Sequence, residues 1–92
     1  MAFLTWPDKD PNEVLDYGLD WTARLAGDSI TASSWTVDVG TITIDSDENT
    51  TTLTTAWLSG GSAGTTYTLT NRVVTEGGRT MDQSVTLDCV EK

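Results

Sequence analysis

Apolar side chains recur at every second position along much of this chain, and this pattern limits its fold more than any other feature. In the last such run, Met81, Val85, Leu87 and Cys89 share one phase, and polar residues fill the other phase. A period of two residues is typical of a β-strand that buries one face. The chain also holds 18 threonines, which are β-branched and favour strands. The sequence therefore predicts an all-β protein.

Short clusters of glycine and polar residues separate the alternating runs and predict turns. These clusters occupy residues 27–28, 45–49, 60–64 and 77–78. Residues 15–25 alternate without a break and predict one strand. Ile30 is out of phase with Trp35, which a bulge or a break near residues 32–34 would correct. Six to seven short antiparallel strands within residues 13–92 are typical of a small β-sandwich.

The first dozen residues lack this alternation. Pro7 and Pro11 restrict the residues before them to extended backbone, so we expect an extended N-terminal arm over residues 1–12 that precedes a sandwich domain over residues 13–92. No strand phase accounts for the apolar side chains of the arm, and we expect them to bind a protein partner. The candidate residues are Phe3, Leu4, Trp6 and Pro7. The alternative is that the arm folds back over an edge of its own sandwich.

The charge balance and the missing residue types exclude several functions. Fourteen acidic and five basic residues give a formal net charge of −9, and the chain has no histidine. The negative charge argues against nucleic acid and membrane partners. Without histidine, a Ser-His or Cys-His nucleophile is impossible. The acids fall in predicted turns and at outward strand positions, where they solvate the surface. We therefore expect no enzymatic activity and no cofactor.

One acidic segment has oxygen ligands at alternate positions, as calcium loops do. Residues 45–49 read Asp-Ser-Asp-Glu-Asn. The complete motif needs glycine at its sixth position and glutamate at its twelfth, where this chain has Thr50 and Ala56. We expect an ordinary polar turn at these residues and no metal site.

Four tryptophans are many for a domain of this size. Trp21 and Trp35 follow the apolar phase of their strands, so we expect both in the core, together with an unreactive Cys89. The position of Trp57 is ambiguous. Exposed tryptophans stack on sugars as well as on proteins, so a carbohydrate-binding β-sandwich module is the alternative function. That function requires at least two coplanar exposed aromatic side chains.

A series of short motifs follows in a fixed order along nearly the whole chain. The first begins Trp6-Pro7-Asp8, and the motifs occupy residues 6–17, 19–25, 27–30, 34–37, 57–61, 64–67, 71–75 and 77–82. In this order the motifs resemble small structural proteins of tailed bacteriophages, of the fiber–tail adaptor type.

The resemblance implies an immunoglobulin-like β-sandwich without catalysis, built into the virion and assembled in the cytoplasm of a bacterial host. A lone cysteine suits that reducing compartment. The implied partners are other phage proteins of the tail, neck, capsid or fibre, with several copies of the chain in each particle. Adaptor at the tail or neck, fibre attachment and capsid decoration are all compatible with the resemblance.

Overall fold

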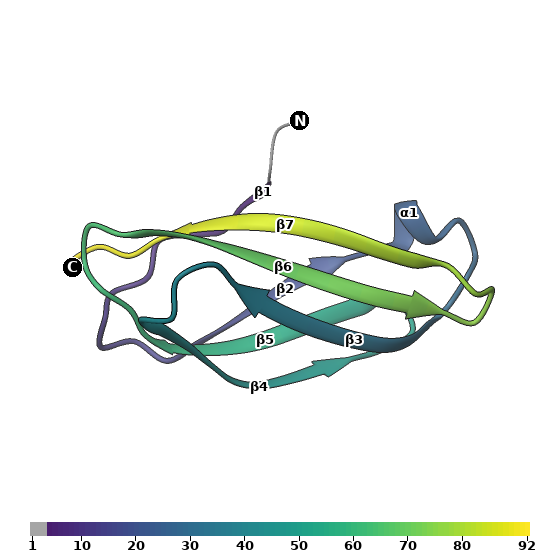
Figure 1. Ribbon diagram of the computed structural model, residues 1–92, viewed down its shortest axis with the longest axis horizontal. Coiled ribbons are helices and arrows are strands. Elements are labelled where there is room, and N and C mark those ends of the chain that lie inside the picture. Colours follow the sequence, from purple (N-terminus) through teal and green to yellow (C-terminus); the bar gives the residue numbers. More distant parts are fainter. Residues whose placement is uncertain (1–3) are drawn as a thin grey trace.

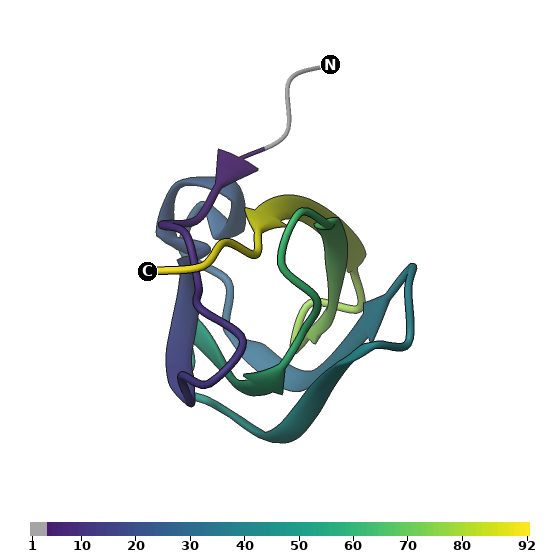
Figure 2. The same ribbon diagram turned by 90° about the vertical axis from the view of Figure 1, so that its left-hand side faces the viewer.

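Two β-sheets pack face to face in the computed structural model, which describes residues 4–92 (Figures 1 and 2). The elements are β1 (Leu4–Thr5), β2 (Leu15–Asp20), α1 (Thr22–Leu25), β3 (Ile30–Val37), β4 (Ile42–Asn49), β5 (Leu53–Gly60), β6 (Thr66–Thr75) and β7 (Thr80–Asp88). The larger sheet has the order β1-β7-β6-β3, and the smaller has the order β2-β5-β4. Paired strands are antiparallel except β1 and β7, which are parallel. The predicted small all-β sandwich is confirmed. The register of β3 shifts between Ile30 and Ala32, next to residues 32–34, near which a bulge or a break was expected.

The inner faces of the two sheets form one apolar core, most of which the predicted alternation identifies. Tyr67 and Leu69 on β6 are fully buried, as are Val85 and Leu87 on β7. Cys89 continues the inward phase beyond β7 and is also buried, as expected. Full burial of one large apolar side chain contributes roughly 1.5–3 kcal/mol, so these strands supply much of the stability.

A polar cluster lies within this core and links the two sheets. The Asn71 side chain is fully buried, and its Oδ1 accepts hydrogen bonds from Trp21 Nε1 (2.9 Å) and Thr54 Oγ1 (2.7 Å). Its Nδ2 donates to Ser33 Oγ and to the Ser34 carbonyl, both at 2.9 Å. The amide thus makes its full set of four hydrogen bonds, which offsets the cost of burying it.

The run at residues 15–25 is not one strand, so this prediction was wrong. Strand β2 ends at Asp20, whose Oδ1 accepts hydrogen bonds from the Thr22 backbone N–H (2.9 Å) and hydroxyl (2.6 Å). Helix α1 follows, and both Trp21 and Leu25 are buried because residues four apart share one face of a helical turn. A spacing of four also fits a period of two, so the apolar pattern did not separate helix from strand.

The acidic segment at residues 45–49 is strand and not the predicted turn. It forms the exposed second half of β4, an edge strand of the smaller sheet. The turn comes after it, where Thr50 Oγ1 accepts hydrogen bonds from the backbone N–H groups of Thr52 (3.2 Å) and Leu53 (3.0 Å). Charged side chains on an edge strand discourage pairing with another chain, which accounts for the composition of this segment.

The glycine pair at residues 77–78 forms the predicted turn between β6 and β7. The Asp28 carboxylate fastens this turn, because it accepts a hydrogen bond from the Gly77 N–H (3.0 Å) and pairs with Arg79 (3.1 Å). A Cβ atom at Gly77 would lie 2.7 Å from Asp28 Oδ2, so any other residue here would force the carboxylate to move. The predicted loop between β5 and β6 is also present, at residues 61–65.

Candidate functional site

The N-terminal residues that we expected to form a free arm lie along β7. Strand β1 pairs with β7, and beyond it the Trp6 N–H donates to the Thr86 carbonyl at 2.9 Å. The Lys9 N–H then donates to the Asp88 carbonyl (3.0 Å), and the Val90 N–H donates to the Lys9 carbonyl (2.8 Å). The segment therefore forms an edge of the larger sheet, as in the alternative in which the arm folds back over its own sandwich.

Trp6 is only 7% exposed, so its own domain covers its ring, as in the alternative in which the arm folds back. Its ring stacks on Tyr17, with centroids 4.8 Å apart and planes at 21°, and lies 5.6 Å from the ring of Trp35. Its Nε1 donates to the Gly18 carbonyl on β2 at 3.2 Å. Trp6 thus joins the edges of the two sheets. No strand phase predicted this position, because the side chain enters the core from between the sheets.

Lys9 is completely buried, which sequence reasoning missed. Its Nζ donates to the carbonyl oxygens of Asp10 (3.0 Å) and Gly60 (2.7 Å), and this fastens the segment to the end of β5. These bonds compensate part of the high cost of burying an ammonium group. Cys89 is paired with Lys9 in a parallel bridge, and burial raises the pKa of its thiol although the charge of Lys9 opposes the shift. No apolar pattern marks a buried lysine.

A polar turn after Lys9 connects this segment to the end of the chain. Asp10 accepts hydrogen bonds from the backbone N–H groups of Asn12 and Lys92, both at 2.8 Å, and these donors lower the pKa of its carboxyl. Glu13 accepts a hydrogen bond from the Asp10 N–H (2.8 Å) and pairs with Lys92 Nζ (2.9 Å), so its pKa is lowered as well. The N-terminal segment is therefore held at both of its ends.

The structure divides the predicted partner-binding residues into two groups. Leu4 is 53% exposed on β1, and Pro7 is also exposed, with its carbonyl accepting a hydrogen bond from the Tyr17 hydroxyl (3.2 Å). Phe3 lies outside the described residues. Leu4 and Pro7 therefore remain on the surface, whereas Trp6 anchors them to the fold.

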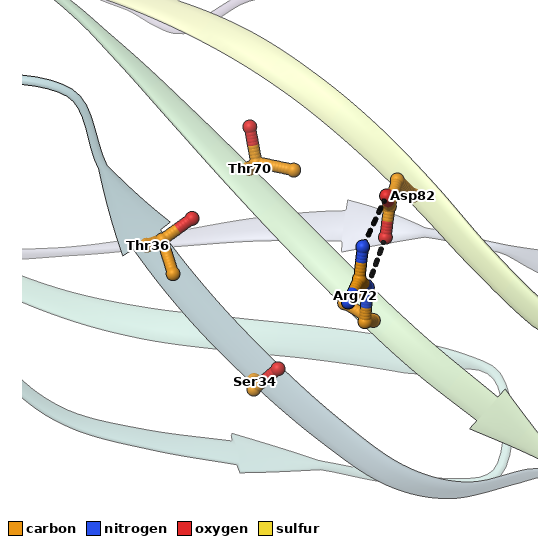
Figure 3. A pocket seen from close by; sticks show the side chains of 5 residues that line it. All are labelled: Ser34, Thr36, Thr70, Arg72 and Asp82. Atoms are coloured by element: carbon orange, nitrogen blue, oxygen red, sulfur yellow. Dashed lines mark hydrogen bonds and ion pairs between the residues drawn. The ribbon is translucent and has the colours of Figure 1, made fainter.

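Hydroxyl groups and one ion pair line a shallow depression on the outer face of the larger sheet (Figure 3). Its lining residues are Ser34, Thr36, Thr70, Arg72 and Asp82. Arg72 donates to both carboxylate oxygens of Asp82, at 2.8 and 3.0 Å, and this contact lowers the pKa of Asp82. The volume, about 170 Å³, is below the roughly 300–1,000 Å³ of typical ligand pockets. The depression is therefore too small for an ordinary small-molecule site.

Trp57 is 38% exposed on the outer face of the smaller sheet. Thr54, Ala56 and Leu58 are fully buried and occupy the inward phase of β5, so Leu53 and Trp57 share the outward phase. Trp57 is the one exposed aromatic side chain in the described part of the chain. A carbohydrate platform of the expected kind needs at least two.

Comparison with known families identifies the chain. A family model described as podophage GP4 fiber-tail adaptor protein gp77 matches residues 9–88. The chain belongs to this family. The match to the adaptor family covers strands β2 to β7. It begins at Lys9 and ends at Asp88, and the backbone N–H of Lys9 donates to the Asp88 carbonyl. This confirms the resemblance and makes the chain a phage structural protein. No curated protein matches the sequence.

The displaced pKa values of the acidic residues all lie on the same side of their ordinary values. Every acidic residue with a displaced pKa has a lowered one, and these residues are Asp10, Glu13, Asp20, Asp28 and Asp82. Hydrogen bonds from backbone and side-chain donors cause these shifts. A general acid needs the opposite shift, towards a raised pKa.

Residues 4–92 contain neither a candidate metal site nor a helix that could span a membrane. Within that range, no group of three or more His, Cys, Asp or Glu side chains is arranged to hold a metal ion. The helix of this range, α1, has four residues, and none there is long and apolar enough to span a bilayer.

Proposed function

We propose that this protein is a non-enzymatic virion component that docks onto other phage tail and fibre proteins through its N-terminal edge and its sandwich surface. The observation that carries the proposal is the exposed edge at β1. Leu4 is 53% exposed on this strand, and Trp6 fixes the strand in place. A partner segment can add to such an edge through main-chain hydrogen bonds, while a pocket on the partner takes the apolar side chain.

Preorganisation supports this docking edge. The hydrogen bonds of Trp6 and Lys9 to β7 and β5 hold the segment against the sandwich before any partner arrives. Docking then costs little additional ordering entropy. Leu4 and Pro7 are the proposed contact residues at this edge, and Phe3, which precedes Leu4 in the sequence, remains a proposed contact residue.

The ion pairs and hydrogen bonds of two acidic residues support the absence of catalysis in this proposal. Asp82 is neutralised by Arg72, and Asp28 is held by Arg79 and backbone donors. The depression on the outer face of the larger sheet is shallow and small. These features suit a structural protein whose charges stabilise its fold and keep it soluble.

We also propose that the sandwich is immunoglobulin-like and that several copies occupy each virion. Without β1, the orders β2-β5-β4 and β7-β6-β3 match strands B-E-D and G-F-C of immunoglobulin sandwiches. Trp35 packs against the core from β3, the strand that corresponds to C, where immunoglobulin domains carry a tryptophan. Copies of one chain usually assemble with closed symmetry, and head-to-tail contacts between them form rings when the rotation closes.

Incorporation into phage particles tests the proposed docking edge. Deleting residues 2–5 removes β1 but leaves Trp6 and Lys9, so we expect a folded protein that no longer enters particles. Leu4→Ser probes the same edge with one change. The matched control is Val74→Ser, because Val74 is 39% exposed near the opposite end of the larger sheet.

Immunoblots of purified particles measure incorporation, and circular dichroism measures folding. Normal incorporation of folded protein in both edge variants would contradict docking through β1. Loss of incorporation in Val74→Ser as well would show that the effect is not specific to this edge.

A further inference from the structure

The outer face of the smaller sheet combines exposed apolar side chains with charge of one sign. Strands β2, β4 and β5 contain five acidic residues and no lysine or arginine. Leu53 and Trp57 are 45% and 38% exposed on this face. The larger sheet differs, because Arg72 there neutralises Asp82. The strands of the smaller sheet therefore supply no positive charge to its outer face.

The strand register places carboxylates beside the exposed aromatic ring. Trp57 lies opposite Asp16 on β2, and Thr55, two residues earlier on β5, lies opposite Glu48 on β4. Opposite residues of an antiparallel pair have Cβ atoms about 5 Å apart. A cation placed over the Trp57 ring would thus be within reach of Asp16. Asp16 and Glu48 form no hydrogen bond or ion pair with another described side chain.

A hollow adjoins the same face at the end near the β4–β5 turn. It has a volume of about 220 Å³ and is lined by Glu48, Asn49, Thr50, Leu53 and Thr55. Leu53 supplies apolar surface and Glu48 a carboxylate, which suits the aliphatic stem and charged end of a lysine or arginine side chain. Leu53 and Trp57 are four residues apart on β5, which corresponds to roughly 13 Å along a strand.

We propose that this face docks an extended basic segment of another protein, with one cationic side chain stacked on Trp57 and another in the hollow beside Leu53. The inference rests on the proposed adaptor function and names the chemistry of the partner. Stacking of a cation on tryptophan is favourable, and tryptophan and arginine dominate the energetics of many interfaces. A second copy of this chain is a poor occupant, because two acidic faces repel each other.

The test uses the full chain and a short Gly/Ser/Thr peptide that carries two arginines four residues apart. In an NMR titration, the expected shifts are those of the Trp57 indole N–H and of Leu53, with weaker binding at high salt. Trp57→Ser and Glu48→Gln should each weaken binding by about tenfold. The matched controls Val74→Ser and Glu76→Gln, also on exposed residues, should leave binding unchanged.

Three outcomes would overturn the inference. The first is equal binding of a peptide with glutamine in place of both arginines. The second is a set of shifts confined to the larger sheet. The third is a Trp57 shift that depends on protein concentration without peptide, which would assign the face to a second copy of the chain.

Particle incorporation separates this inference from the proposed function. A protein that enters particles but does not bind the arginine peptide contradicts the basic partner and supports the adaptor role. A protein that binds the peptide through Trp57 but never enters particles supports the docking face and contradicts the adaptor role.

Discussion

The indole ring of Trp6 stacks on the phenol ring of Tyr17, with centroids 4.8 Å apart and an interplanar angle of 21°. The contact joins a segment that runs along β7 to a residue of β2 in the opposite sheet. A residue that precedes the regular strands thereby becomes part of the core between the two sheets. The N-terminal segment consequently contributes to folding as well as to any docking.

Replacing Trp6 with alanine should destabilise the protein strongly. The change removes a buried ring and leaves a cavity, for which a loss of about 3 kcal/mol in the free energy of unfolding is expected. Trp57→Ala is the matched control, because Trp57 lies on the outer face, and should cost less than about 1 kcal/mol. Urea unfolding followed by circular dichroism measures both. Equal losses would show that Trp6 does not belong to the core.

Lys9 and Lys92 provide a second matched pair of substitutions. Lys9→Ala leaves the carbonyls of Asp10 and Gly60, the first of them buried, without the ammonium group that donates to both, so we expect a loss of about 2 kcal/mol. Lys92 forms an exposed ion pair with Glu13, and Lys92→Ala should cost less than about 1 kcal/mol. Thermal and urea unfolding compare the two variants. A smaller loss of stability for Lys9→Ala than for Lys92→Ala would argue against the burial of Lys9.

Asn71→Leu, which nearly preserves the size of the side chain, should be among the substitutions that destabilise the protein most. The substitution removes the acceptor of Trp21 Nε1 and Thr54 Oγ1 inside the core, and we expect a loss of about 2–4 kcal/mol. Ser84→Ala removes a hydrogen bond with Thr70 on the outer face and serves as the control. Urea unfolding curves of the two variants give the comparison. A neutral Asn71→Leu would mean that the polar cluster is not needed for stability.

The free energy of unfolding should fall at acid pH, in part because Asp28 becomes protonated. The Thr75 hydroxyl, the Ser29 and Gly77 backbone N–H groups and Arg79 lower the pKa of Asp28 to about 2 from 3.8. Because the pKa is lower in the folded state, the stabilisation is complete above about pH 5 and is lost as the pH falls through 3.8 towards about 2.

Asp28→Asn should therefore lose less stability than the parent protein between about pH 5 and about pH 2. Urea unfolding at a series of pH values measures the difference. Glu76→Gln, which also removes one exposed negative charge in the same turn region, is the control for the change in net charge. Identical pH profiles for the parent protein and Asp28→Asn would contradict the lowered pKa.

The Cys89 thiol should be unreactive in the folded protein. It is 1% exposed, and burial raises its pKa, so both access and thiolate formation are disfavoured. Alkylation by iodoacetamide near pH 8 should be at least about tenfold slower than in urea-unfolded protein. A cysteine introduced at Ser62, in the exposed loop after β5, should react fast under the same conditions. Fast labelling of native Cys89 would contradict its burial.

Strands β6 and β7 could be predicted because their pattern has a single cause. Each buries one face against the other sheet, so Tyr67, Leu69, Val85 and Leu87 alternate with polar residues. The β6–β7 turn was also predictable, since a glycine pair favours hairpin backbone. Where two structures satisfy one pattern, as at Trp21 and Leu25, prediction from spacing was wrong. The acidic half of β4 was missed because an exposed edge strand has little apolar alternation.

For the candidate site too, some side-chain positions could be predicted from the sequence and others could not. Sequence reasoning selected Leu4 and Trp6 together because both are apolar and lie outside the strand pattern, yet one is exposed and the other buried. Trp57 was ambiguous because its strand carries apolar residues in both phases. The burial of Lys9 had no sequence signal, because its partners are main-chain carbonyl groups.

By itself, the sequence determined the all-β class, the number of strands, the glycine turn and the family, because these depend on local periodicity, turn chemistry and the order of motifs. Only the tertiary structure decided that Trp6 is buried, that Trp57 is exposed and that Lys9 lies inside. The physical reason is that burial outside a regular strand depends on which distant segments meet. Here residues 4–9 lie against residues 85–90 from the other end of the chain.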